Sequence, residues 1–256
     1  QGNSPVSVSD NDRGSTTVPD NEDINGDFTM NTTNNYLEYR VRIKPNISTA
    51  DPYVNDIRKQ HKNVVLVDVG DAIQDNQIDV FAKTKKYYKD HPVPKVLNAM
   101  KYDVFVLGNH EFNFGQDYLK EAINLFKGKV LCANCVDDKG EVALGQPYDI
   151  IEKDGIKIGL IGLITSHVPK WEQPEYISGL TFLDSVETAK KWARVLRPEV
   201  DALLVTYHGG PDKDLTTGEK IGLGDREHDA LRLIDEVEEL DAIFCGHQHR
   251  AICALY

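Results

Sequence analysis

Four polar fragments of this chain combine residue types that bind divalent cations with neighbouring glycines. They are Gly70-Asp71, Gly108-Asn109-His110-Glu111, His208-Gly209-Gly210 and Gly246-His247-Gln248-His249. Carboxylate, amide oxygen and imidazole suit Zn, Mn, Fe or Mg better than soft copper, and no thiolate is needed. Glycine beside a ligand permits the unusual dihedral angles of a tight turn. The chemistry that this set indicates is phosphoester hydrolysis at a site with two divalent metal ions.

Short apolar runs precede these fragments, and such runs are typical of strands buried in a parallel or mixed sheet. They span residues 64–67, 104–107, 202–206 and 242–245. Each run would deliver its polar residues to a carboxyl edge, where open α/β sheets bind their ligands. We therefore expect residues far apart in the sequence to converge on one crevice.

Helical patterns alternate with the strands and predict stacked α/β layers. They cover residues 51–61, 93–101, 117–127, 185–197 and 226–239. The apolar stripe of the fourth helix is better explained by core packing than by ligand binding. Residues 148–153 and 156–163 predict a hairpin, because the intervening Asp154-Gly155 suits a tight primed turn.

The ordered fragments resemble the calcineurin-like metallophosphoesterases, in particular the branch with 5'-nucleotidases and 2',3'-cyclic-nucleotide 2'-phosphodiesterases. The resemblance runs from about residue 60 to the end and rests on residues 68–74, 108–115, 161–165 and 246–250. It implies an α/β fold, namely the layered α-β-β-α sandwich of that family. Asn113 occupies a position where the 5'-nucleotidases tend to have Asp and the cyclic phosphodiesterases have Asn. That difference favours cyclic nucleotides as substrates.

The resemblance also implies two divalent metal ions and a role for each ligand. Asp71 would bridge the two ions, and His249 would belong to one metal site. The other metal site would be completed by Asn109, His208 and His247.

His110 resembles the family's histidine that stabilises developing charge or protonates the leaving oxygen. We expect His110 and Asn109 to contact the substrate. With Asn in place of Asp at position 113, the sequence identifies no orienting partner for His110. The role of Glu111 is less clear than that of either neighbour.

The first family motif, Asp-x-His-Gly after an amino-terminal strand, is altered in this chain. Its closest match is Asp23-Ile24-Asn25-Gly26, with Asn25 where His is expected. The preceding residues 16–22 are too polar for a buried strand and include Pro19. Asp23 and Asn25 are therefore either ligands of a more weakly held first metal or part of a polar turn.

Length and charge fit one catalytic domain. Residues 1–35 are predicted to form a polar, flexible arm, and residues 36–256 the catalytic domain, without the carboxyl-terminal domain that relatives carry. A formal charge of −12 disfavours binding to nucleic acid and favours a small nucleotide attracted locally by the metals. No apolar run approaches the roughly 18 residues of a membrane span. The resemblance implies an extracellular, cell-surface or periplasmic location.

Several alternatives remain open at this point. The chain can be a general metal-dependent phosphatase or 5'-nucleotidase, or a noncatalytic surface or binding protein with an impaired first metal site. His61, His91, His167 and His228 are expected to lie outside the site. Cys132 and Cys135 have the spacing of a zinc half-site but lack a matching second pair, so structural thiols are the favoured interpretation.

Overall fold

The computed structural model describes residues 29–31, 36–38, 47–73, 77–84, 91–215, 217–221, 226–250 and 252–254. The chain divides into two compact units. The larger unit comprises residues 65–214 and 218–248, and the smaller comprises residues 1–64, 215–217 and 249–256.

The described residues of the smaller unit form a two-stranded antiparallel sheet and one helix. Its strands are β1 (Thr29–Asn31) and β2 (Tyr36–Glu38), with Met30 opposite Leu37. Helix α1 (Ile47–Gln60) contains the predicted helix apart from its last residue and begins four residues earlier. Most of the predicted arm, residues 1–28 and 32–35, lies outside the described residues.

Two sheets form the centre of the larger unit. The four-stranded sheet has the order β11-β10-β8-β7, with strands Ala242–Cys245, Ala202–His208, Ile156–Ile164 and Tyr148–Lys153. The first three strands are parallel, and β7 is antiparallel to β8. The three-stranded sheet is parallel and has the order β3-β4-β5, with strands Val67–Asp68, Val104–Val106 and Lys129–Leu131. A short antiparallel pair joins β6 (Cys135–Val136) and β9 (Thr181–Phe182).

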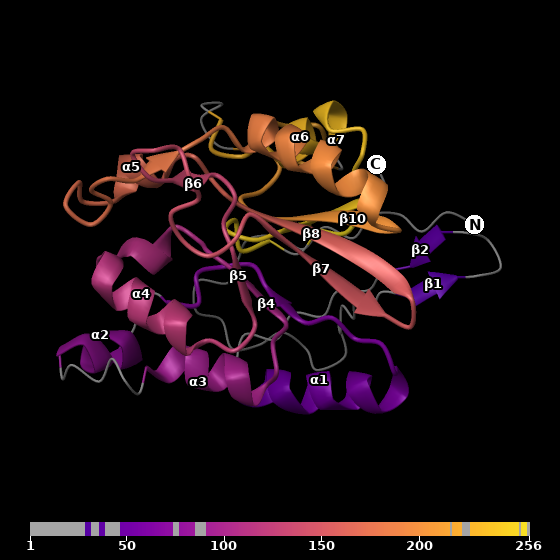
Figure 1. The fold of residues 1–256 in the computed structure, drawn as a ribbon, viewed down its shortest axis with the longest axis horizontal. Helices are drawn as coiled ribbons and strands as arrows, with labels where there is room; N and C mark the ends of the chain where they lie inside the picture. Colours follow the sequence, from indigo (N-terminus) through magenta and orange to yellow (C-terminus); the bar gives the residue numbers. More distant parts are fainter. Residues whose placement is uncertain are drawn as a thin grey trace. The chain divides into compact units, whose positions relative to one another are not determined.

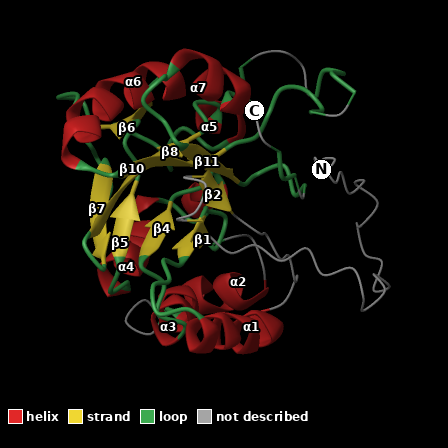
Figure 2. Ribbon diagram, turned by 90° about the vertical axis from the view of Figure 1, so that its right-hand side faces the viewer, coloured by secondary structure: helices red, strands yellow, loops and turns green. Residues whose placement is uncertain are grey.

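Helices cover the outer faces of these sheets (Figures 1 and 2). Helices α6 (Ser185–Leu196) and α7 (Ala230–Glu236) lie over the four-stranded sheet, and α3 (Pro92–Ala99) and α4 (Gln116–Leu125) lie over the three-stranded sheet. The other helical elements described in this unit are α2 (Gln77–Thr84), α5 (Val168–Trp171) and the 3₁₀ turns η2 (His110–Phe112) and η3 (Arg197–Glu199). The larger unit is thus layered α-β-β-α, as the sequence predicts.

Apolar side chains hold the layers together. Val104, Val106 and Leu131 of one sheet pack with Leu160 and Leu204 of the other. The predicted stripe of α6 is buried against β8 and β10, so its interpretation as core is confirmed. The helix begins at a carboxylate cap, because Asp184 accepts hydrogen bonds from the main-chain N–H groups of Val186 and Glu187.

The predicted hairpin is confirmed. Lys153 pairs with Ile156, and the intervening Asp154 and Gly155 have φ values of 50° and 82°, as a primed turn requires. The helix predicted for residues 226–239 is shorter and begins at Ala230. The main-chain carbonyl of Glu227 accepts from the hydroxyls of Thr165 and Tyr207, instead of starting a helical hydrogen-bond ladder. Within the described residues, no helix combines the length and apolar character needed to cross a bilayer.

Candidate metal centre

The carboxyl ends of the two sheets meet at one place, as the sequence predicts. Asp71 and Asn109 follow β3 and β4 of one sheet, whereas His208 ends β10 and His247 follows β11 of the other. The Nε2 atom of His208 lies 3.1 Å from Asp71 Oδ2 and 3.1 Å from Asn109 Oδ1. Ligand atoms of Asp71, His208 and His247 all lie within 4.8 Å of one another. Four of the predicted ligands are therefore brought together.

The turns that carry these ligands have unusual backbone conformations. Gly70 has a φ of 95°, and a Cβ atom at this position would lie 2.6 Å from the main-chain nitrogen of Gly108. Only glycine therefore lets the β3 and β4 turns approach this closely. Asp71 and His247 also have positive φ values, 62° and 72°, which are uncommon for residues with a side chain. Strained conformations of this kind are typical of functional sites.

His208 presents one defined ring nitrogen to the site. Its Nδ1 lies 2.6 Å from the carbonyl oxygen of Val69, which can only accept a hydrogen bond. Nδ1 therefore carries a proton, and Nε2 faces the oxygens of Asp71 and Asn109. Burial works against the charged form of His208, but the hydrogen bond and charge of Asp71 outweigh it and raise the pKa of the ring. Positive charge is favoured between these side chains, which fits a cation site.

Glu111 organises the two turns, a role that the sequence leaves unclear. Its fully buried carboxylate accepts hydrogen bonds from the main-chain nitrogens of Asp71 and Ile73, both at 2.8 Å, and of Gly108 at 2.5 Å. The side chain therefore fixes the turn after β3 to the turn after β4. Burial, followed by the charge of Asp71, raises the pKa of Glu111 to about 8.

His110 has an orienting partner, which the sequence alone does not identify. Its Nδ1 lies 2.7 Å from Asn113 Oδ1, and the Asn113 amide nitrogen donates to Glu172 Oε1 at 3.0 Å. The amide oxygen of Asn113 accepts from the ring, as a carboxylate oxygen would. The main-chain nitrogen of His110 also donates to Asp71 Oδ1 at 3.0 Å, which places the histidine beside the ligand group.

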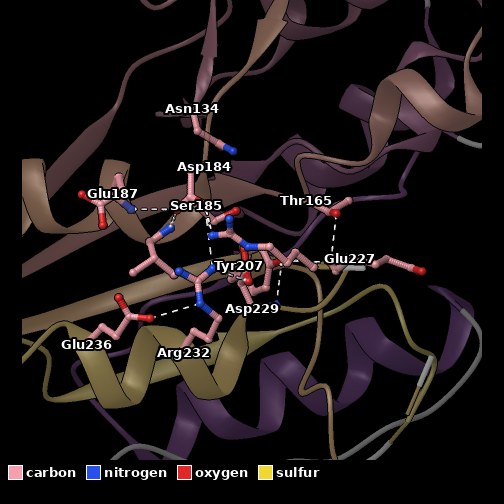
Figure 3. A network of polar contacts seen from close by, with 12 residues as sticks. Asn134, Thr165, Asp184, Ser185, Glu187, Tyr207, Glu227, Asp229, Arg232 and Glu236 are labelled. Atoms are coloured by element: carbon pink, nitrogen blue, oxygen red, sulfur yellow. Dashed lines mark hydrogen bonds and ion pairs between the residues drawn. The ribbon is translucent and has the colours of Figure 1, made fainter. Parts of the chain in front are cut away.

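Glu227 and His228 lie beside His247, although the sequence predicts His228 to lie outside the site. Glu227 Oε1 is 3.0 Å from His247 Nε2 and 3.5 Å from His228 Nε2. These three side chains form a second group whose ligand atoms lie within 4.8 Å of one another. Figure 3 shows Glu227 beside Thr165 and Tyr207, whose hydroxyls donate to its carbonyl oxygen. No sequence signal points to Glu227 or His228 as site residues, because both fall within the helix predicted for residues 226–239.

Other side chains named from the sequence have different outcomes. Cys132 and Cys135 are buried free thiols, which agrees with structural roles. His91 is buried against the ring of Tyr118. Asp23 and Asn25 lie outside the described residues, and His249 belongs to the smaller unit. The roles of these last three residues as ligands of the first metal stay predictions.

Known proteins resemble this chain over most of its length. The family model described as "Calcineurin-like phosphoesterase" matches residues 43–251. A 2',3'-cyclic-nucleotide 2'-phosphodiesterase/3'-nucleotidase from Salmonella typhimurium is 35% identical over 208 residues, which are 77% of this chain and 31% of the relative. A 5'-nucleotidase from Vibrio cholerae is 31% identical over 222 residues, which are 86% of this chain and 38% of that relative. The chain thus spans less than two fifths of either curated relative.

Solved structures show the same fold. The calcineurin-like phosphoesterase YfkN from Bacillus subtilis has a TM-score of 0.67 and 30% identity, covering 78% of this chain and 62% of that one. The NAD nucleotidase of Haemophilus influenzae has a TM-score of 0.62 and 26% identity, covering 84% of this chain and 38% of that one. The family match, the layered fold and the convergent ligands agree. This chain belongs to the calcineurin-like phosphoesterase family, in the branch related to the 5'-nucleotidases and 2',3'-cyclic-nucleotide phosphodiesterases.

Proposed function

We propose that the chain hydrolyses phosphoesters of small nucleotides with the help of two divalent metal ions. The observation that carries this proposal is the convergence of Asp71, Asn109, His208 and His247 at the carboxyl edges of two sheets. Divalent cations bound there would make water nucleophilic near neutral pH and hold the phosphate oxygens. Asp71 would contact both ions, and His249, with Asp23 and Asn25, would serve the first one.

His247 is held in a way that suits a metal ligand. Its Nε2 atom lies 3.0 Å from Glu227 Oε1, so a proton on Nε2 is directed at the carboxylate. Nδ1 is then the ring nitrogen left for a cation. A carboxylate behind a ligand histidine commonly fixes the tautomer of the ring and strengthens its basicity. Glu227 is accordingly proposed to orient His247.

His110 is proposed to act on the leaving oxygen. Its Nδ1 is engaged by Asn113 and its main-chain nitrogen by Asp71, so Nε2 is the nitrogen left to face a substrate. Once Nε2 is protonated as well, the ring can donate that proton or a hydrogen bond as negative charge develops on the leaving oxygen. Asn109 would contribute its amide to the same phosphate.

Two observations favour 2',3'-cyclic nucleotides among the possible substrates. Asn113 has the residue type that the cyclic phosphodiesterases have at this position, and the Salmonella relative is named as such an enzyme. The Vibrio cholerae relative, which is named a 5'-nucleotidase, supports nucleoside 5'-monophosphates as the second candidate. From the family resemblance, we also propose a location outside the cytoplasm, which cell fractionation would test.

The test is hydrolysis by the full-length protein loaded with Zn or Mn. We expect turnover of 2',3'-cyclic AMP and release of phosphate from 3'-AMP, with slower release from 5'-AMP. Asp71→Asn should lower kcat by at least about 10³-fold, because it removes the shared carboxylate of the metal site. An empty or half-filled metal site, together with hydrolysis of none of these compounds, would instead support the noncatalytic alternative.

A further inference from the structure

We infer that Glu172 is a positioning residue for His110 and acts through the side-chain amide of Asn113. The three side chains form a chain of hydrogen bonds, 2.7 Å from His110 Nδ1 to Asn113 Oδ1 and 3.0 Å from Asn113 Nδ2 to Glu172 Oε1. This inference rests on the proposed function, in which His110 acts on the leaving oxygen.

Glu172 decides which way the amide of Asn113 faces. The oxygen and nitrogen ends of an amide have nearly the same shape, so packing alone discriminates poorly between its two orientations. An ionised carboxylate only accepts hydrogen bonds, and Glu172 therefore selects the orientation in which the NH₂ group of Asn113 faces it. The oxygen of Asn113 must then face His110.

The orientation of the amide in turn decides the tautomer of His110. An amide oxygen can only accept, so Nδ1 of a neutral His110 ring carries the proton. Nε2 then carries the lone pair that takes up a second proton, and this is the proton that the ring can give to the leaving oxygen. If the amide were reversed, its NH₂ group would face Nδ1, the proton of the neutral ring would move to Nε2, and the doubly protonated ring would lose its acceptor at Nδ1. Glu172 thus sets the protonation pattern of a ring that it does not touch.

The position of Glu172 is built into the fold rather than being a chance surface contact. It follows α5 directly, and its main-chain nitrogen donates to the Val168 carbonyl at 3.0 Å. The ring centroids of the preceding Trp171 and of His247 lie 5.4 Å apart, so the end of this short helix contacts two parts of the centre. Among the described residues, Glu172 Oε2 is buried and has no hydrogen-bond partner. Leaving a buried carboxylate oxygen without a hydrogen-bond partner costs free energy. Such unpaired groups in a folded protein are typical of functional sites.

Asn113 and Glu172 also form a matched pair. An aspartate at position 113 would place two carboxylates at the distance that now separates the amide nitrogen from Glu172 Oε1, and like charges there repel. Exchanging the amide and the acid restores the pattern, because a glutamine at position 172 can donate to an aspartate at position 113. The effect of Glu172→Gln should therefore change sign with the residue at position 113.

The experiment compares Glu172→Gln, Asn113→Asp and the double variant in the full-length, zinc-loaded protein. Glu172→Gln should lower kcat for 2',3'-cyclic AMP about tenfold with little change in KM, which is part of the 10² to 10⁴ that a positioned acid supplies. The loss should be smaller for a p-nitrophenyl ester, whose leaving group needs no proton. The double variant should recover most of the loss. Glu175→Gln, at an exposed acid on the same segment, is the matched control.

A second measurement is independent of activity. Nitrogen-15 shifts of the His110 ring at about pH 8, where an ordinary imidazole is neutral, report which nitrogen carries the proton. We expect the proton on Nδ1 in the unaltered protein and in the double variant, and a mixture of tautomers in Glu172→Gln. An unchanged tautomer in Glu172→Gln, or a double variant worse than the sum of the single changes, would overturn the inference. If the unaltered protein hydrolyses no phosphoester, the proposed function fails, while the nitrogen shifts still decide the role of Glu172.

Discussion

The two halves of the candidate centre are held by different means. In the half formed by Asp71, Asn109 and His208, the fixing contacts come mainly from the main chain. Glu111 binds three main-chain N–H groups of the turns, and the Val69 carbonyl fixes the ring of His208. In the other half, single side-chain contacts orient the histidines. Glu227 meets His247 directly, and Glu172 acts on His110 through Asn113.

This difference separates what the fold determines from what individual residues adjust. The main-chain half follows from strand register and glycine turns, so it is preserved wherever the sheets form. The side-chain half depends on a few acids that can be exchanged without disturbing a strand. We infer that the first half holds its ligands in a fixed framework, and that the second sets the tautomers of the histidines and thereby tunes metal affinity and rate.

The strongest way to break the main-chain half is Glu111→Gln. The new amide would direct an NH₂ group at main-chain N–H donors, and at least one buried donor would lose its acceptor. We expect the free energy of unfolding of the zinc-loaded protein to fall by about 3 kcal/mol, the scale for unpaired buried polar groups. Chemical denaturation followed by circular dichroism measures it. A change in the free energy of unfolding within about 0.5 kcal/mol, as at an ordinary surface site, would mean that the two turns are stable without the Glu111 carboxylate.

In the side-chain half, we expect Glu227→Gln to have a different effect from that of Glu111→Gln. The fold should be unchanged, whereas zinc affinity should fall about 10- to 100-fold, as is usual when the carboxylate behind a ligand histidine is lost. Titration calorimetry with zinc measures the affinity, and Glu238→Gln, an exposed acid after α7, serves as the control. Tighter binding, or a loss of stability as large as that of Glu111→Gln, would erase the distinction between the halves.

The sequence predicts the metal ligands of both halves, but not the acids that orient the histidines of the side-chain half. Asp71, Asn109, His208 and His247 could be named because each follows an apolar strand next to glycine. Glu227 falls in a segment predicted to be helical, and Glu172 lies in a segment without periodicity. Their contacts join residues 20 and 59 positions apart, which no local pattern encodes.

Two helices were predicted wrongly or missed for related physical reasons. The helix predicted from residue 226 begins later because the Glu227 carbonyl accepts hydrogen bonds from the hydroxyls of Thr165, just after β8, and of Tyr207 in β10. Helix α5, of four residues, is too short to show a helical period. The hairpin and α6 were predictable because turn chemistry and an apolar stripe are local features.

The central claim is that Asp71, Asn109, His208 and His247 share a divalent cation. Anomalous diffraction from manganese-soaked crystals of the full-length protein tests it most directly. We expect a peak about 2.0 to 2.3 Å from oxygens of Asp71 and Asn109 and from nitrogens of His208 and His247, the usual range for such ligands. A peak held only by Glu227, His228 and His247, or no peak near Asp71, would contradict the account.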